Sequence, residues 1–210
     1  QAQTGTGKTA AFAIPVIQLL ATRKVQKEQY STRCLVMVPT HELAIQVSDV
    51  FKQLITGLGL HVVGVYGGVE QDKQISLLKN GTDVLVATPG RMFDLASQGF
   101  LSFKNVEILI IDEADHMLEL GFINDMEQLI RRIPRNRQTL FFSATINKHI
   151  KDLAYGLVRH AVRIHISPKD PVSKNIDHSV AFVEMDDKRF FLERFINENP
   201  DSKILVFVRT

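Results

Sequence analysis

The sequence has little cysteine, no long apolar run and no visible signal peptide, and each absence excludes a class of protein. Its 210 residues contain one cysteine, Cys34, so no internal disulfide can form. No group of Cys and His residues has the spacing of a zinc site. The longest apolar stretch, residues 10–21, is too short to cross a bilayer and contains Pro15 and Gln18. These features fit a reducing compartment, and we expect a cytoplasmic protein.

The sequence also has little net charge. Lys and Arg number 25 and Asp and Glu 23, which gives +2, too small a balance to indicate nucleic-acid binding by itself. Any surface that binds nucleic acid must therefore be local. The composition, 45% hydrophobic and 23% charged, is that of a globular protein and excludes a disordered or low-complexity chain. The length indicates one large domain, or one domain with a further piece.

Short apolar, β-branched runs alternate with helical patterns along most of the chain. The runs predict strands at 34–38, 61–66, 83–88, 107–111, 139–142 and 162–166, and the patterns between them predict helices at 42–55, 72–79, 92–98, 122–133 and 147–157. Such alternation predicts an α/β fold with a parallel sheet flanked by helices.

The alternation changes after residue 166. Residues 167–177 contain Pro168 and Pro171 and are predicted to be a linker. A strand at 178–184, a helix at 188–197 and a strand at 203–208 are expected to follow. We therefore predict a first domain over 1–166 and a second, incomplete one over 178–210.

A phosphate-binding pattern opens the chain. Residues 2–9 match the phosphate-loop motif except that Ala2 stands where a glycine is usual. Small residues let backbone N–H groups surround a phosphate, and the helix that follows adds its positive end. The expected loop is Thr4, Gly5, Thr6 and Gly7, with Lys8 reaching the β and γ phosphates and Thr9 binding Mg²⁺. The alternative is a glycine turn before a helix.

An acidic tetrad, residues 112–115, directly follows the predicted strand 107–111. Carboxylates at the carboxyl end of a buried strand lie where open α/β sheets bind ligands. Asp112 would hold Mg²⁺, and Glu113 would orient and deprotonate the attacking water. The alternative is an ordinary acidic helix N-terminus. Both motifs require a nucleoside triphosphate with magnesium, so each strengthens the other, and we assign Lys8, Asp112 and Glu113 to catalysis.

The tetrad reads Asp-Glu-Ala-Asp, and the chain resembles a DEAD-box RNA helicase of superfamily 2. Further segments resemble that family's motifs, in order and over essentially the whole chain: 39–44, 67–68, 88–91, 143–145 and 203–210. The resemblance implies two RecA-like lobes that bind ATP, Mg²⁺ and RNA. It also implies that Ser143 and Thr145 hydrogen-bond to Asp115 and couple hydrolysis to strand separation.

Three of these segments are expected to contact RNA. The residues are Pro39, Thr40, His41, Gly67, Gly68, Thr88, Pro89, Gly90 and Arg91. Each segment follows a predicted strand, so all would lie at the carboxyl edge of one sheet. Helix N-termini, glycines and one arginine fit a phosphate backbone and read no bases, so RNA binding should be independent of sequence. Singly, each segment also fits a simple cap or turn.

The sequence departs from the family in two respects. His41 stands where the family has arginine, and an isolated histidine is mostly neutral at pH 7, so we expect weaker RNA binding that improves toward pH 6. The family's adenine-reading segment and most of its second lobe, which supplies an arginine finger, are missing from these residues. We expect a partial chain with little ATPase activity of its own.

Several alternatives stay open. A DNA-directed superfamily 2 translocase is one, and a non-catalytic RNA clamp that uses ATP only as a latch is another. The basic residues Arg131, Arg132, Arg135 and Arg137 are interpreted as a solvated surface, and Phe190, Phe191 and Phe195 as the core face of the last helix.

Overall fold

The structure is a computed structural model that describes residues 7–23, 25–26, 28–145, 148–158, 161–166, 177 and 179–208. The chain divides into two compact units, residues 1–168 and 169–210. Among the described residues, no helix is both long and apolar enough to cross a membrane.

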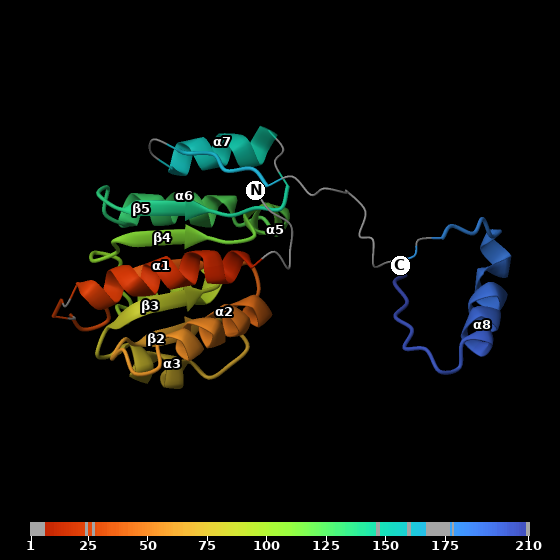
Figure 1. The fold of residues 1–210 in the computed structure, drawn as a ribbon, viewed down its shortest axis with the longest axis horizontal. Helices are drawn as coiled ribbons and strands as arrows, with labels where there is room; N and C mark the ends of the chain where they lie inside the picture. Colours follow the sequence, from red (N-terminus) through yellow and green to blue (C-terminus); the bar gives the residue numbers. More distant parts are fainter. Residues whose placement is uncertain are drawn as a thin grey trace. The chain divides into compact units, whose positions relative to one another are not determined.

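The first unit is built on a parallel sheet of five strands in the order β2-β3-β1-β4-β5 (Figure 1). The strands are β1 (Thr32–Met37), β2 (Val62–Val65), β3 (Thr82–Ala87), β4 (Ile108–Ile111) and β5 (Gln138–Phe141). Every residue of β1, β3 and β4 is buried, as expected for the inner strands of a sheet covered on both faces. The prediction of an α/β fold with a parallel sheet is confirmed.

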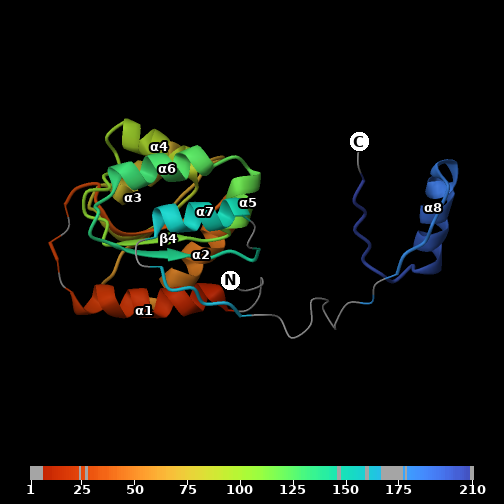
Figure 2. The ribbon, with the colours of Figure 1, turned by 90° about the horizontal axis from the view of Figure 1, so that it is seen from above.

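Seven helices precede, connect or follow these strands in the described part of the first unit. They are α1 (Lys8–Thr22), α2 (His41–Leu54), α3 (Gln71–Leu78), α4 (Pro89–Ser97), α5 (Ala114–Glu119), α6 (Ile123–Arg132) and α7 (Lys148–Leu157). Figure 2 shows α1 on one side of the sheet and α4 and α6 on the other. The short helix α5 was not predicted.

The sheet separates two apolar cores because neighbouring residues of a strand point to opposite faces. In β1, Leu35 and Met37 pack in the core that contains Met92 of α4 and Leu129 of α6. Cys34 and Val36, on the other face, pack in the core that contains Phe12 of α1 and Phe51 of α2.

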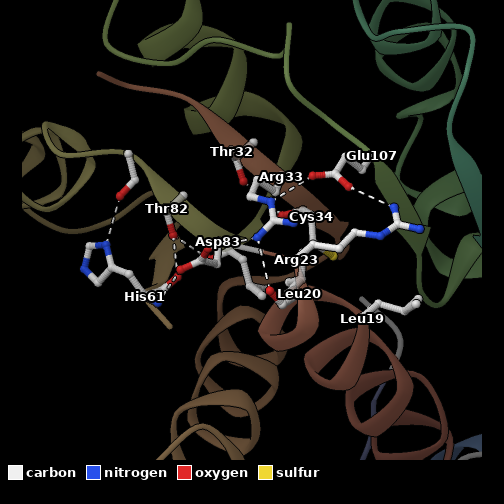
Figure 3. Close-up of polar contacts among 12 residues, drawn as sticks. Leu19, Leu20, Arg23, Thr32, Arg33, Cys34, His61, Thr82, Asp83 and Glu107 are labelled. Carbon is white, nitrogen blue, oxygen red and sulfur yellow. Dashed lines mark hydrogen bonds and ion pairs between the residues drawn. The ribbon is translucent and has the colours of Figure 1, made fainter. Parts of the chain in front are cut away.

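A buried ionic cluster lies at the amino ends of the strands (Figure 3). Arg33, whose side chain is 6% exposed, donates from Nε to Glu107 at 2.8 Å and from Nη1 to the Leu20 carbonyl at 3.3 Å. Its Nη1 also lies 3.6 Å from Asp83, which accepts a hydrogen bond from the His61 backbone at 2.8 Å. The cluster joins the end of α1 to β1, β3 and the residue before β4, so it braces the end of the sheet opposite the predicted site.

The strand predicted at 162–166 does not form. Residues 161–166 belong to no helix or strand, and Val162 is 86% exposed. A strand forms when its backbone bonds to that of a neighbouring strand. In the described chain β5 pairs only with β4, so residues 161–166 do not join the sheet beside it. The prediction was therefore wrong because a β-branched sequence alone does not supply the pairing partner.

In the described residues of the second unit, a short 3₁₀ helix η1 (Met185–Asp187) precedes α8 (Lys188–Glu198) and no strand forms. The predicted strands at 178–184 and 203–208 are therefore not observed. Phe190, Phe191 and Phe195 are 36–59% exposed, so their assignment to a core face was wrong for this structure. One helix without a sheet offers no apolar layer to cover them. The identity of this unit as a second lobe stays a prediction, and most of the linker lies outside the described residues.

Candidate active site at the carboxyl edge of the sheet

The predicted phosphate loop is described only at its end. Thr4, Gly5 and Thr6 lie outside the described residues. Gly7 caps α1 with φ of 80°, a left-handed conformation that glycine adopts without strain. Its carbonyl accepts a hydrogen bond from Ala11 at 3.0 Å, and Lys8 and Thr9 form the first turn of the helix. The helix expected after the loop is therefore present, with Lys8 at its start.

Asp112 follows β4 and is 3% exposed. Burial raises the pKa of its carboxyl above the ordinary value, while the Glu113 N–H and the charge of Lys8 act in the opposite direction. The N–H lies 2.9 Å from Oδ1 and fixes the carboxylate. A desolvated carboxylate near a lysine is the kind of group that a bound cation stabilises.

The donor set fits magnesium. In the described part of the chain no group of three or more His, Cys, Asp or Glu residues could hold a metal ion. Mg²⁺ does not require such a cage, because it is bound through one or two carboxylates together with phosphates and water. Asp112 and the Thr9 hydroxyl are residue types that meet this requirement.

Glu113 has an unusual backbone conformation. Its φ of 48° and ψ of 49° place it in the left-handed region, which costs a residue other than glycine on the order of 1–3 kcal/mol. It is the N-cap of α5, and its carboxylate lies 3.6 Å from Nδ1 of His116 one turn later. His116 was not predicted as a site residue. Residues three apart on a helix are neighbours, so the position of His116 three residues after the candidate base could have indicated this contact.

Asp115 and Thr145 form the contact that the resemblance implied. Oδ2 of Asp115 accepts from the Thr145 backbone N–H at 2.8 Å and from its hydroxyl at 3.0 Å. Partial burial raises the pKa of Asp115, but the bonds from Thr145, with the Ser143 hydroxyl acting in the same direction, leave it below the ordinary value. Ser143 also donates to the Thr145 carbonyl at 2.6 Å, which tightens the turn after β5.

The segments expected to contact RNA lie at the same edge, because each follows the carboxyl end of a parallel strand. Thr40, next to Pro39, caps α2 and accepts a hydrogen bond from Leu43 at 3.3 Å. Thr88 precedes α4, and Pro89 occupies the first helical position, so the helix begins three residues before its predicted start at residue 92.

The double-glycine segment and Arg91 lie beside each other. Gly68 has φ of 79°, and a Cβ placed on Gly67, Gly68 or Gly90 would meet no atom within 4 Å. Internal packing therefore does not require glycine at these positions, and the backbone there is open to a ligand. Both Nη atoms of Arg91 donate to the Val69 carbonyl, at 3.1 and 3.2 Å, which fixes the guanidinium next to the glycines.

His41 begins α2 and is held by two neighbours. Its Nε2 lies 2.8 Å from Oε1 of Glu42, and its ring stacks on Tyr66 with centroids 6.3 Å apart and planes 28° apart. Neither neighbour was predicted as part of the site. Tyr66 directly precedes Gly67 and follows β2, so its position after a strand was an available signal.

The basic residues near α6 have structural contacts. Arg132 lies 5.3 Å from the centre of the Phe93 ring, and Arg137 donates to the Pro134 carbonyl at 2.7 Å. They precede β5 and so lie at the other end of the strand from the acidic tetrad.

Comparison with known sequences assigns this chain to a protein family. Residues 1–153 match the family model described as DEAD/DEAH box helicase. The whole chain aligns with the ATP-dependent RNA helicase RhlB of Shewanella frigidimarina and with the DEAD-box ATP-dependent RNA helicase CshA of Streptococcus pneumoniae, at 38% identity in each case. The chain spans only 49% and 39% of the length of these two proteins.

Solved structures agree. A DEAD box protein from Methanococcus jannaschii matches with a TM-score of 0.71 and 37% identity, over 93% of this chain and 51% of that one. A hypothetical ATP-dependent RNA helicase from Sulfolobus tokodaii matches with a TM-score of 0.67 and 39% identity, over 76% of this chain and 44% of that one. The first unit has the RecA-like fold of these proteins, and the chain belongs to the DEAD/DEAH box helicase family.

Proposed function

We propose that this chain is part of an ATP-dependent RNA helicase that couples ATP hydrolysis to local separation of RNA duplexes. One observation supports this most directly. The predicted catalytic residues Asp112 and Glu113 and the predicted RNA residues follow parallel strands of one sheet and so share one edge, where Thr145 of one segment bonds to Asp115 of another. Ligands bind at this edge of such a sheet. Because the nucleotide residues and the RNA residues would both lie there, a change at the bound nucleotide could move the RNA contacts.

ATP is the proposed substrate, and Mg²⁺ the proposed cofactor. The loop from Thr4 to Gly7 would surround the phosphates, with Lys8 reaching the β and γ positions. Thr9 and Asp112 would hold Mg²⁺, which would neutralise the charge on the phosphates. Glu113 would orient the attacking water and take its proton.

RNA would be bound through its backbone. The open glycines, the fixed guanidinium of Arg91 and the start of α2 present N–H groups and one charge at the edge of the sheet. Phosphate contacts of this kind carry no sequence information, so many RNAs should bind alike. The proposed location of this RNA duplex separation is the cytoplasm.

A second RecA-like lobe in cis is the proposed partner of this edge. It would supply the arginine finger, which is worth about 10³–10⁵ in rate for this class of reaction. The 210-residue chain alone should therefore hydrolyse ATP slowly.

The test is RNA-stimulated phosphate release by the gene product that carries this chain, with Glu113→Gln as the matched variant. We expect RNA to stimulate release more than DNA of the same sequence. Glu113→Gln should abolish release but keep ATP-dependent RNA binding. Equal stimulation by DNA would indicate a DNA translocase instead. Long-lived RNA complexes with ATP and no hydrolysis would indicate a clamp.

A further inference from the structure

We propose that Gln74 is a positioning residue for RNA binding, because it holds the loop that presents Gly67 and Gly68 to a phosphate. This double-glycine loop comprises residues 66–69 and lies between β2 and α3. The inference rests on the proposed function, since the two glycines belong to the proposed RNA edge. Gln74 would act through the loop and would not touch the RNA itself.

The double-glycine loop is attached at both ends through its carbonyl groups. The Tyr66 carbonyl accepts a hydrogen bond from Nε2 of Gln74 at 2.9 Å. The Val69 carbonyl accepts from both Nη atoms of Arg91, at 3.1 and 3.2 Å. The two carbonyls that flank the glycines are thus bonded to side chains, one from α3 and one from α4.

The N–H groups between these carbonyls remain available to a ligand. In the part of the chain that the structure describes, no backbone carbonyl accepts from the N–H of Gly67 or Gly68, and both residues are exposed. Gly68 has φ of 79°, and successive N–H groups in such a turn form a concave site for an anion. A loop whose acceptors are bonded to the protein and whose donors face solvent therefore fits a phosphate.

Gln74 occupies a position that suits an apolar side chain. In α3, all of whose residues the structure describes, only Gln74 and Leu78 are buried, and residues four apart share one face of a helix. Gln74 is 5% exposed, whereas Leu77 is 51% exposed. The buried face of a helix is ordinarily apolar, so packing alone does not explain an amide there.

The amide of Gln74 should contribute little to the stability of the fold. Its Nε2 is bonded to Tyr66, but its Oε1 is buried and has no hydrogen-bond partner among the described residues. A buried polar atom without a partner opposes folding. The bond that is made and the bond that is missing offset each other in the free energy of unfolding, whereas only the first acts on the loop.

Holding the loop before RNA arrives lowers the cost of binding. A loop released from Gln74 would have more conformations, and only some of them would turn both glycine N–H groups toward one phosphate. Binding would then have to order the loop, and this ordering subtracts from the affinity. The expected loss is about 2- to 12-fold in RNA affinity, the size of one net hydrogen bond.

The first test needs no RNA and uses Gln74→Met in the 210-residue chain. Methionine has a similar length and volume but removes both polar atoms of the amide. The midpoint of urea unfolding should change little, while the ¹⁵N order parameters of Gly67 and Gly68 should fall toward the flexible range, below about 0.6. Unchanged order parameters at both glycines would overturn the proposal.

Gln71→Met is the matched control, because it makes the same substitution on the same helix. Gln71 donates to Oε1 of Gln98 at 2.7 Å on the exposed surface, so it joins α3 to α4 without touching the loop. It should leave the two glycine signals unchanged. Gln74→Leu, a second apolar variant, should behave like Gln74→Met and keeps the test decisive if methionine prevents folding.

The second test measures binding of a fluorescent oligouridine at several salt concentrations. Gln74→Met should weaken binding by about 2- to 12-fold, and Gln71→Met should not. The salt slope should stay the same in Gln74→Met, because no charge that meets a phosphate is removed. A shallower slope would show that the substitution has lost a phosphate contact, and it would overturn a role in positioning alone.

The gene product that carries this chain separates binding from catalysis. Gln74→Met should raise the RNA concentration for half-maximal ATPase stimulation by a similar factor and leave the rate at saturating RNA unchanged, as expected when only binding is weakened. Unchanged RNA affinity in the variant would overturn the inference while the proposed function stands. No RNA-stimulated hydrolysis by the unsubstituted gene product would overturn both.

Discussion

Thr145 donates two hydrogen bonds to one carboxylate oxygen of Asp115, from its backbone N–H at 2.8 Å and from its hydroxyl at 3.0 Å. The two residues are 30 positions apart and come from segments that follow neighbouring strands, β4 and β5. A shift of the acidic tetrad would therefore also move the turn after β5, because these two hydrogen bonds connect them. The contact is a physical connection from the proposed nucleotide residues to that turn.

Removing the Thr145 hydroxyl should weaken the contact between Thr145 and Asp115 without abolishing it. Thr145→Val keeps the shape and the backbone N–H but loses one hydrogen bond, at a cost of about 0.5–1.5 kcal/mol in free energy of unfolding. In the gene product, ATP hydrolysis should fall less than duplex separation, so more ATP is used per duplex. Thr145→Ser, which keeps the hydroxyl, is the control. Equal loss of both activities would contradict a coupling role.

The same contact gives a pH dependence. The pKa of Asp115 in the folded chain lies below its ordinary value, so the contact stabilises the fold at neutral pH and above the unfolded pKa. That stability is lost as the pH falls through the lowered pKa. The stability difference between the unsubstituted chain and Asp115→Asn, from urea unfolding, should therefore shrink between about pH 5 and pH 3.

Asp112 should show the opposite sign. Burial raises its pKa, so ionisation at neutral pH opposes folding in the absence of a cation. Asp112→Asn keeps an acceptor for the Glu113 N–H and removes the charge. We expect it to raise the free energy of unfolding at pH 7 by roughly 0.5–2 kcal/mol, the usual size of a stabilising substitution. The gain should diminish as the pH falls and the aspartate becomes protonated.

Magnesium-dependent hydrolysis by the gene product should be lost in the same variant. Asp94→Asn on the exposed side of α4 is a matched control, and it should change neither property. A less stable Asp112→Asn variant at pH 7 would show that the carboxylate contributes structurally instead.

The backbone of Glu113 allows a direct measurement of strain. Glycine adopts a φ of 48° freely, whereas alanine does not. Glu113→Gly should therefore be more stable than Glu113→Ala by about 1–2 kcal/mol in urea unfolding, although both lose the carboxylate. At an ordinary helical position, such as Glu127 of α6, glycine should be less stable than alanine by about 1 kcal/mol. The same order at both sites would show that residue 113 is not held in the left-handed region.

The strands of the first unit could be predicted because buried parallel strands are continuous apolar runs. Residues 107–111 predicted β4 within one residue of its observed start at Ile108. The six-residue helix α5 was missed because fewer than two turns give no clear periodicity. The candidate site residues were predicted from the phosphate-loop pattern and from the resemblance to the family, and the rule that ligands bind at the carboxyl ends of parallel strands placed several of them at one edge. Their roles stay predictions.

Contacts across the sheet could not be predicted in this way. Arg33 pairs with Asp83 and Glu107 because β1 lies between β3 and β4, and the strand order is not written in the periodicity of any one strand. His41 meets Tyr66 for a similar reason, since the contact depends on how α2 lies against β2. Such pairs appear only once the sheet is assembled.

Gly64 and Ser48 offer a test of how closely α2 packs on β2. A Cβ at residue 64 would lie 2.8 Å from Oγ of Ser48, closer than such atoms approach, so Gly64→Ala forces a shift. We expect Gly64→Ala to lower the free energy of unfolding by about 1–3 kcal/mol, as overpacking of a core does. Ser48→Ala should be neutral or stabilising, because the buried hydroxyl has no partner among the described residues.

The double variant decides between a local clash and a general defect. Ser48→Ala removes the nearest atom, so Gly64→Ala should cost less in its presence, with a coupling of about 0.5–3 kcal/mol. The rescue should be partial, because Cε1 of Tyr66 would still lie 3.3 Å from the new methyl group. The residual strain then falls on the ring that stacks on His41. RNA binding by the double variant should therefore be weaker than its recovered stability indicates, whereas additive costs in urea unfolding would show that Ser48 and Gly64 do not meet.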